Sequence, residues 1–108
     1  MSRRLPRLEV WDWPEMPRRQ WGPIAWGWLH RAADEYPDRP TMAEAQNAGL
    51  RLKNFFDGLP CPECKKHAYR YLQRNPPDLS SKDAFRLWAW RFHNAVNARL
   101  GKRLIAFR

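Results

Sequence analysis

The sequence has only two cysteines, and both belong to one Cys-x-x-Cys pair, Cys61 and Cys64. This scarcity excludes a small secreted scaffold held together by several disulfides. Long apolar runs are also missing, since the richest stretch, from Trp21 to Leu29, is far shorter than the ~20 residues of a membrane-spanning helix. No apolar segment of the secretory type follows the basic N-terminus, so we expect a soluble, cytoplasmic protein without membrane association.

The sequence is rich in aromatic and basic residues. Its 108 residues are 44% hydrophobic and include seven tryptophans, a composition too apolar for disorder and a length that suits one domain. Twenty Lys and Arg against 11 Asp and Glu give a net charge of +9, which favours anionic partners such as nucleic acid, anionic lipid, nucleotides or acidic proteins. No recognition-helix or RNA-binding motif accompanies this charge, so nucleic acid is not the expected partner.

Apolar periodicity and capping residues predict four helices joined by short loops. The first begins at Trp21, accepts Pro23 in its first turn and ends near Tyr36. The other three run from caps at Thr41, at Cys61 and in the Ser80-Ser81 pair to stops at Gly58, Asn75 and Gly101.

Four helices without an alternating strand pattern predict an all-α fold, a four-helix bundle. Residues 1–19, which combine prolines with charges of both signs, read as an irregular basic arm, and residues 20–108 as a single domain. Helical spacing places Met42, Leu52 and Phe55 on the inward side of the second helix.

The Cys61–Cys64 pair opens the third helix, with His67 one turn further on. This spacing allows a disulfide, and a helix N-terminus favours a thiolate, so redox chemistry is the preferred interpretation. Two cysteines, His67 and another histidine would also provide enough ligands for a zinc site. However, the sequence spacing between Cys64 and His67 is too short for a zinc finger. Unreactive thiols are a third interpretation.

Two further groups of side chains call for partners. Trp26 and His30 are neighbours on the first helix and could form one wall for a flat ring, or a core with one buried histidine. A polar strip on the fourth helix either faces water or meets another helix or a polar ligand. The strip consists of Trp90, His93, Asn94, Asn97 and Gly101.

Three motifs occur in order along the chain. Trp-Gly-Pro-x-x-Trp-x-x-Leu-His-x-x-Ala-x-x-Tyr-Pro spans residues 21–37, and Pro-Cys-x-x-Cys-x-x-His spans residues 60–67. Trp-x-x-x-x-His-Asn-x-Val-Asn-x-x-Leu-Gly-Lys spans residues 88–102. With this order and spacing, the chain resembles the ERV/ALR family of FAD-dependent sulfhydryl oxidases over about three quarters of its length.

The resemblance implies a four-helix bundle plus a short fifth helix or turn, with FAD bound at the mouth of the bundle. Cys61 is then the sulfur that receives a substrate thiol, and Cys64 passes two electrons to the flavin, which gives them to O2 and yields hydrogen peroxide. No metal is implied. The residues implied to contact FAD are Gly22, Trp26, His30, Tyr36, His67, His93, Asn94, Val96, Asn97 and Lys102.

The chain departs from many family members because it has no additional shuttle disulfide, no C-terminal cysteines, and Pro23 in place of an arginine. We therefore expect a minimal enzyme of the viral or phage branch, which oxidises a partner protein's thiols directly in the host cytoplasm or the virion. The family often forms homodimers through its first two helices, so a homodimer is a hypothesis here. The alternatives are a zinc-stabilised basic nucleic-acid-binding module and an FAD-binding interaction domain without oxidase activity.

Overall fold

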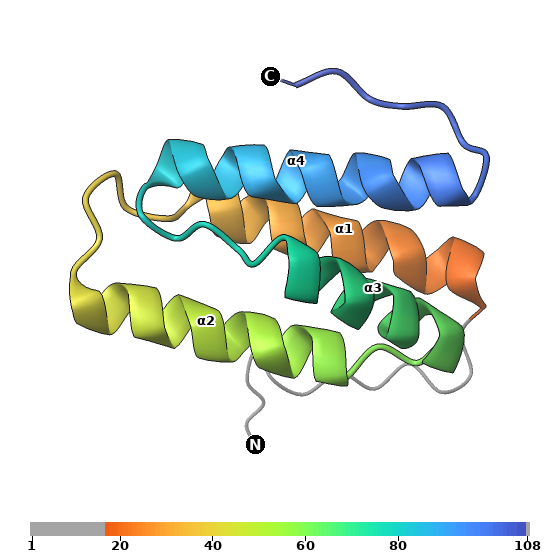
Figure 1. Cartoon of the computed structure of the whole chain (residues 1–108), viewed down its shortest axis with the longest axis horizontal. Coiled ribbons are helices and arrows are strands. Elements are labelled where there is room, and N and C mark those ends of the chain that lie inside the picture. The colour runs from red at the N-terminus through yellow and green to blue at the C-terminus, as the bar shows by residue number, and fades with distance from the viewer. Residues whose placement is uncertain (1–16, 108) are drawn as a thin grey trace.

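The computed structural model describes residues 17–107, which form a bundle of four α-helices (Figure 1). The helices are α1 (Arg18–Asp34), α2 (Met42–Asp57), α3 (Pro62–Arg74) and α4 (Lys82–Arg99). No strand occurs within residues 17–107. The prediction of an all-α, four-helix bundle is confirmed, while residues 1–16 of the predicted arm lie outside the described part of the chain.

Helix α1 begins earlier than its apolar periodicity indicated. Pro17 is the N-cap residue and the helix starts at Arg18 rather than Trp21, so Arg18 and Arg19 are helical although we assigned them to the arm. Pro23 consequently lies inside the helix, and its expected place in the first turn was wrong. An interior proline cannot donate the backbone hydrogen bond to the carbonyl four residues earlier, so the helix tolerates one missing bond here.

Capping side chains define the starts of α2 and α4 as predicted. Thr41 Oγ1 accepts a hydrogen bond from the Glu44 backbone N–H at 3.0 Å, and Glu44 Oε1 accepts one from the Thr41 N–H at 2.8 Å. Ser81 Oγ accepts the Ala84 N–H at 3.0 Å. Met42, however, is 77% exposed rather than inward-facing. The first turn of α2 extends past the packed part of the helix, since residues 41–44 are all exposed.

An aromatic cluster fills the centre of the bundle. Leu29 of α1, Phe56 of α2 and Phe85 of α4 are the most completely buried large side chains among the described residues. The rings of Trp88 and Phe92 stack with centroids 5.4 Å apart, and Phe56 meets Phe92 edge-on at the same distance. Such aromatic pairs contribute about 0.5–1.5 kcal/mol each beyond their burial. The cluster therefore holds α2 against α4 and fixes the helices that frame the site.

Helix α4 ends in a Schellman motif that reverses the chain. Gly101 has a φ of +72°, a left-handed conformation that glycine adopts without steric cost. Its N–H donates to the Ala98 carbonyl at 3.2 Å, and the Lys102 N–H donates to the Asn97 carbonyl at 2.8 Å. Residues 102–107 then run back beside α4 as an irregular segment, so in the described chain a turn occurs and no fifth helix (Figure 1).

Two side chains of the polar strip on α4 hold this returning segment. The Trp90 indole N–H donates to the Ile105 carbonyl at 2.7 Å. Asn94 Nδ2 donates to the same carbonyl at 2.9 Å, and Asn94 Oδ1 accepts the Ile105 N–H at 2.8 Å. The Phe107 ring packs against Trp90 with centroids 5.3 Å apart. Part of the strip therefore finds its partner within the chain itself.

Candidate active site

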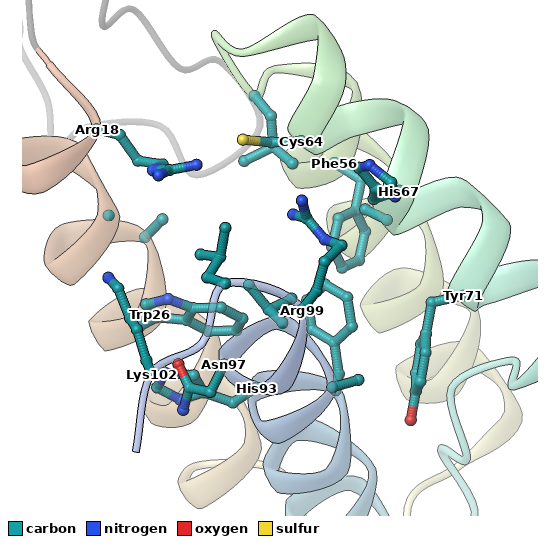
Figure 2. A pocket seen from close by; sticks show the side chains of 18 of the residues that line it. Arg18, Trp26, Phe56, Cys64, His67, Tyr71, His93, Asn97, Arg99 and Lys102 are labelled. Atoms are coloured by element: carbon teal, nitrogen blue, oxygen red, sulfur yellow. The ribbon is translucent and has the colours of Figure 1, made fainter. Parts of the chain in front are cut away.

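A cavity of about 1070 Å³ opens between α1, α3 and the C-terminal half of α4 (Figure 2). Its apolar wall includes Trp26 of α1, Phe56 of α2, Tyr71 of α3 and Phe92 of α4. Ligand sites typically occupy ~300–1,000 Å³, so this cavity lies just above that range. Its size and aromatic lining suit a large ligand with flat rings.

The two cysteines lie at the N-terminal end of α3. Cys61 is the N-cap residue, and its Sγ accepts a hydrogen bond from the Cys64 backbone N–H at 3.1 Å. Pro62 occupies the first helical position. The Cys64 side chain lines the cavity, whereas Cys61 does not, and both residues are half-buried. One helical turn therefore presents two thiols with different access to the cavity.

Arg18, the first residue of α1, faces Cys64 across the mouth of the cavity, and the two side chains point toward one another (Figure 2). Burial is the main factor that raises the pKa of the Cys64 thiol; a hydrogen bond with Cys61 raises it further, and hydrogen bonding to Arg18 opposes the rise. A helix N-terminus led us to expect a stabilised thiolate. For Cys64, desolvation outweighs that effect, because the side chain points into the cavity.

Two histidines and a tryptophan form a compact group beside the cavity. The Trp26 and His93 rings stack with centroids 3.7 Å apart and planes 10° from parallel. His30 Nε2 lies 2.8 Å from His93 Nδ1, a hydrogen bond whose direction depends on the tautomers. Burial, with smaller contributions from the positive charges of His30 and Lys102, lowers the pKa of His93 to about 4. Burial also lowers the pKa of His30, against the charge of Asp34, so the pair is neutral at pH 7.

Asn97 supplies a buried polar group to the cavity wall. It is only 7% exposed, and its Nδ2 lies 3.5 Å from Asn94 Oδ1, at the outer limit of a hydrogen bond. A buried amide with so long a contact retains hydrogen-bonding capacity for a ligand. Figure 2 shows Asn97 beside His93 and Lys102.

The structure brings most of the predicted site residues together. Cys61 at the helix cap and His30 behind His93 adjoin the cavity without lining it. The predicted residues that line the cavity are Gly22, Trp26, Cys64, His67, His93, Val96, Asn97 and Lys102.

Tyr36 and Asn94 lie away from the cavity wall, although the resemblance implied that both contact FAD. Tyr36 is 6% exposed; its hydroxyl donates to the Leu79 carbonyl at 2.7 Å, and its ring meets Phe85 edge-on. Asn94 is bonded to Ile105 in the returning C-terminal segment. Both side chains therefore have structural partners within the chain.

Several residues of the cavity wall were missed by sequence reasoning, among them Arg18, Tyr71 and Arg99. Arg18 was assigned to the irregular arm, and neither Tyr71 nor Arg99 was singled out as a site residue, yet all three line the cavity. Helical spacing was the available signal: Arg18 lies one turn before Trp21, and Tyr71 lies one turn after His67.

The residues around the cavity fit FAD. Aromatic side chains can receive its flat rings, and the buried Asn97 amide can bond a polar edge. Cationic side chains suit the pyrophosphate, and no Asp or Glu of residues 17–107 lines the cavity. The cations are Arg18, Arg19, Arg70, Arg74, Arg99, Lys102 and Arg103.

The zinc interpretation gains no support from the described residues. Within residues 17–107, no three His, Cys, Asp or Glu side chains gather as a metal site requires. His67 Nε2 lies 3.7 Å from a carboxylate oxygen of Glu63 on the same helix. None of the four helices is long and apolar enough to cross a bilayer.

Comparison with known proteins gives concordant results for sequence and fold. The Erv1/Alr family model matches residues 23–107. The chain is 40% identical over 87 residues to an FAD-linked sulfhydryl oxidase of African swine fever virus, covering 81% of this chain and 73% of the relative. It is 33% identical over 81 residues to the FAD-linked sulfhydryl oxidase ERV1 of Arabidopsis thaliana, covering 75% of this chain and 42% of that protein. The crystal structure of the FAD binding domain of Erv1 from Saccharomyces cerevisiae superposes with a TM-score of 0.81 and 30% identity, covering 85% of this chain and 88% of that one. The chain belongs to the Erv1/Alr family.

Proposed function

We propose that this chain acts as an FAD-dependent thiol oxidase whose redox centre is the Cys61–Cys64 pair. The observation that carries the proposal is the position of Cys64, on the wall of a cavity that fits FAD and one helical turn from Cys61. Membership of the Erv1/Alr family supports this activity, as do relatives named FAD-linked sulfhydryl oxidases.

The two cysteines have different roles in this proposal. Cys61 is the sulfur that a substrate attacks, because it caps α3 and does not line the cavity. Cys64 is the inner sulfur, because its side chain faces the space in which FAD would lie. Thiol–disulfide exchange depends on which sulfur is accessible, so this geometry sets the direction of electron flow.

The reaction begins with the Cys61–Cys64 disulfide. A substrate thiolate attacks the Cys61 sulfur, which breaks the bond to Cys64 and leaves a mixed disulfide and a Cys64 thiolate. A second substrate thiol, once deprotonated, attacks the sulfur of its own chain in the mixed disulfide and releases Cys61 as a thiolate. The substrate has lost two electrons and two protons, and the pair is reduced. The chemistry that bound FAD supplies is acceptance of these two electrons and their transfer to O2, which yields hydrogen peroxide.

Arg18 stabilises the Cys64 thiolate in this scheme. Burial raises the pKa of Cys64, so a neighbouring cation is needed to keep the released sulfur ionised. The Arg18 guanidinium faces this side chain across the cavity mouth (Figure 2), and its interaction with Cys64 lowers the pKa of the thiol against the effect of burial. The positive charge therefore acts on the sulfur that leaves in the first exchange step and donates electrons afterwards.

Cofactor binding is assigned to the other residues of the wall. Trp26 and His93 provide stacked aromatic surfaces, and Asn97 provides a buried amide. Lys102 lies at the end of α4, on the same side of the cavity, and is the cation that we assign to the pyrophosphate.

The substrate, acceptor and assembly of the enzyme are further parts of the proposal. The substrate is a partner protein with paired thiols, and O2 is the final acceptor. A homodimer through α1 and α2 is supported by Ile24 and Leu50, which are large apolar side chains exposed on those helices. Viral relatives favour the host cytoplasm or the virion as the place of action.

The decisive experiment follows the flavin absorption of the FAD-loaded protein. Dithiothreitol added without oxygen should bleach the absorption, and readmitted O2 should restore it with release of hydrogen peroxide. Cys64→Ser should retain the flavin absorption but lose bleaching, with oxidase turnover reduced by roughly two to three orders of magnitude or more, because the inner sulfur is gone. Ala43→Ser, an exposed substitution on α2, is the matched control and should behave like wild type.

Other outcomes would point to the alternatives. A colourless protein that cannot be loaded with FAD contradicts the proposal. A yellow protein that consumes no oxygen with thiols would be the redox-sensitive interaction domain without oxidase activity. Full turnover in Cys64→Ser would remove Cys64 from the mechanism.

A further inference from the structure

The wall of the cavity carries more positive charge than FAD requires. Seven Lys and Arg side chains line it, and no carboxylate of residues 17–107 does. The pyrophosphate carries two negative charges, and three of the cations, Arg99, Lys102 and Arg103, cluster where α4 ends. Those three can neutralise the pyrophosphate and Arg18 faces Cys64, which leaves Arg70 and Arg74 on α3 for another anion.

Helix α3 concentrates the remaining charge next to the redox pair. It contains four basic residues and one acidic residue, Glu63, whose carboxylate lies near His67. Arg70 and Arg74 are exposed, and among the described residues no carboxylate forms an ion pair with either. Their charge is therefore available to a molecule that approaches from solvent.

The two arginines continue the stripe of α3 that begins with Cys64, the inner cysteine of the redox pair. Cys64, His67, Arg70 and Arg74 follow one another at three- and four-residue steps, and all four line the cavity. From Cys61 to Arg70 the helix rises by roughly 14 Å along its axis, at about 1.5 Å per residue, and nine positions at about 100° each also place the two residues about half a turn apart around it. An extended segment that follows the surface of the helix over this rise and half-turn needs about six or seven residues, at about 3.3 Å each.

We propose that Arg70 and Arg74 form a docking surface for an acidic thiol substrate, a protein segment with Asp or Glu about five to seven residues from its reactive cysteine. Such a segment can place its cysteine at Cys61 while its carboxylates reach the arginines along α3. The electrostatic field of these arginines also raises the local concentration of acidic segments and orients them before the thiol–disulfide exchange step. This inference rests on the proposed function, because it specifies the substrate of that reaction.

Binding of redox-inert peptides tests the docking surface apart from catalysis. The probes are two labelled peptides with serine in place of each cysteine, one with Glu at the flanking positions and one with Gln, and Kd is measured by fluorescence anisotropy on the FAD-loaded protein. We expect the Glu peptide to bind about three- to tenfold more tightly at low salt, as two exposed ion pairs would give. The difference should vanish near 1 M salt, where the Debye length is about 3 Å.

Double variants test whether Arg70 and Arg74 cause the preference for the Glu peptide. Arg70→Gln with Arg74→Gln should abolish the preference for the Glu peptide, whereas Arg70→Lys with Arg74→Lys should retain it, because the charge is kept. Arg31→Gln with Arg39→Gln removes the same charge from exposed positions that do not line the cavity, and should leave the preference intact. The lysine pair keeps the test decisive if the glutamine pair does not fold.

Three results would overturn the docking proposal: equal Kd values for the two peptides, a preference that survives the glutamine pair, and tighter binding of a single-stranded oligonucleotide than of the Glu peptide at the same arginines. Oxidation of dithiothreitol by the wild-type protein is measured in parallel. That reaction involves no acidic segment, so its presence or absence reports on the proposed function separately.

Discussion

Asn94 and Asn97 lie three positions apart on α4, yet their side-chain amides have different partners. Asn94 exchanges two hydrogen bonds with the backbone of Ile105, while Asn97 is buried on the cavity wall with only a long contact to Asn94. The sequence placed both on one polar strip. It could not separate their roles, because helical spacing identifies a shared face but not the group that covers each position.

Tyr36 gives a test at the scale of one residue. Tyr36→Phe removes the hydroxyl that donates to the Leu79 carbonyl, and should lower stability by about 1 kcal/mol, or a few degrees in Tm. The amount of FAD bound per chain should not change, because the hydroxyl already has a partner away from the cavity. Thermal unfolding and the flavin absorption measure the two effects.

The matched control is Tyr71→Phe, on the tyrosine that lines the cavity. This variant tests whether removal of a tyrosine hydroxyl by itself alters FAD binding. Loss of FAD in Tyr36→Phe without loss of stability would contradict the structural role and restore the cofactor contact that the family resemblance implied.

At the scale of elements, the segment after α4 depends on side chains of the helix it returns beside. Asn94→Ala removes two of the hydrogen bonds that hold Ile105, each worth about 1 kcal/mol. We expect the segment to open more often, and trypsin to cleave after Lys102 and Arg103 about tenfold faster. Asn47→Ala, on the exposed side of α2, should leave the cleavage rate unchanged. Equal rates in both variants would show that Asn94 does not hold the segment.

Local chemistry explains which parts of the fold were predictable. The capping box at Thr41 and the cap at Ser81 are encoded within a few residues, so those boundaries were predicted correctly. The start of α1 was not, because Pro23 normally marks a first turn, and tertiary packing here tolerates it in the interior. The exposure of Met42 likewise depends on where the bundle ends, which periodicity does not encode.

For the whole molecule, the neutral pair His30 and His93 makes stability depend on pH. The pKa of His93 falls from its ordinary value of 6.5 to about 4 on folding, so the unfolded chain binds a proton more readily between these values. The stability that comes from keeping His93 neutral is therefore complete above about pH 6.5. It is lost progressively as the pH falls from about 6.5 through about 4. His30 shifts in the same direction. We expect Tm to decrease from pH 7 to pH 5.

Two variants test whether the His30–His93 pair causes this pH dependence of Tm. His93→Phe removes the shifted group and should flatten the dependence of Tm on pH in that range, whereas His67→Gln, which removes a histidine outside the pair, should not. Thermal unfolding at several pH values is the measurement. A dependence that is equally steep in His93→Phe would mean that carboxylates or other groups cause the acid sensitivity.

The attachment of the C-terminal segment has a consequence for how the protein responds to its chemical surroundings. Hydrogen bonds and ring packing secure it, and the only two cysteines of the chain belong to the redox pair. A change in the redox potential of the solution can therefore oxidise or reduce the Cys61–Cys64 pair, and no other disulfide is broken when this happens. Reductant at concentrations that unfold disulfide-stapled domains should leave this bundle folded. The redox state of the cysteine pair can then be changed while the fold stays the same.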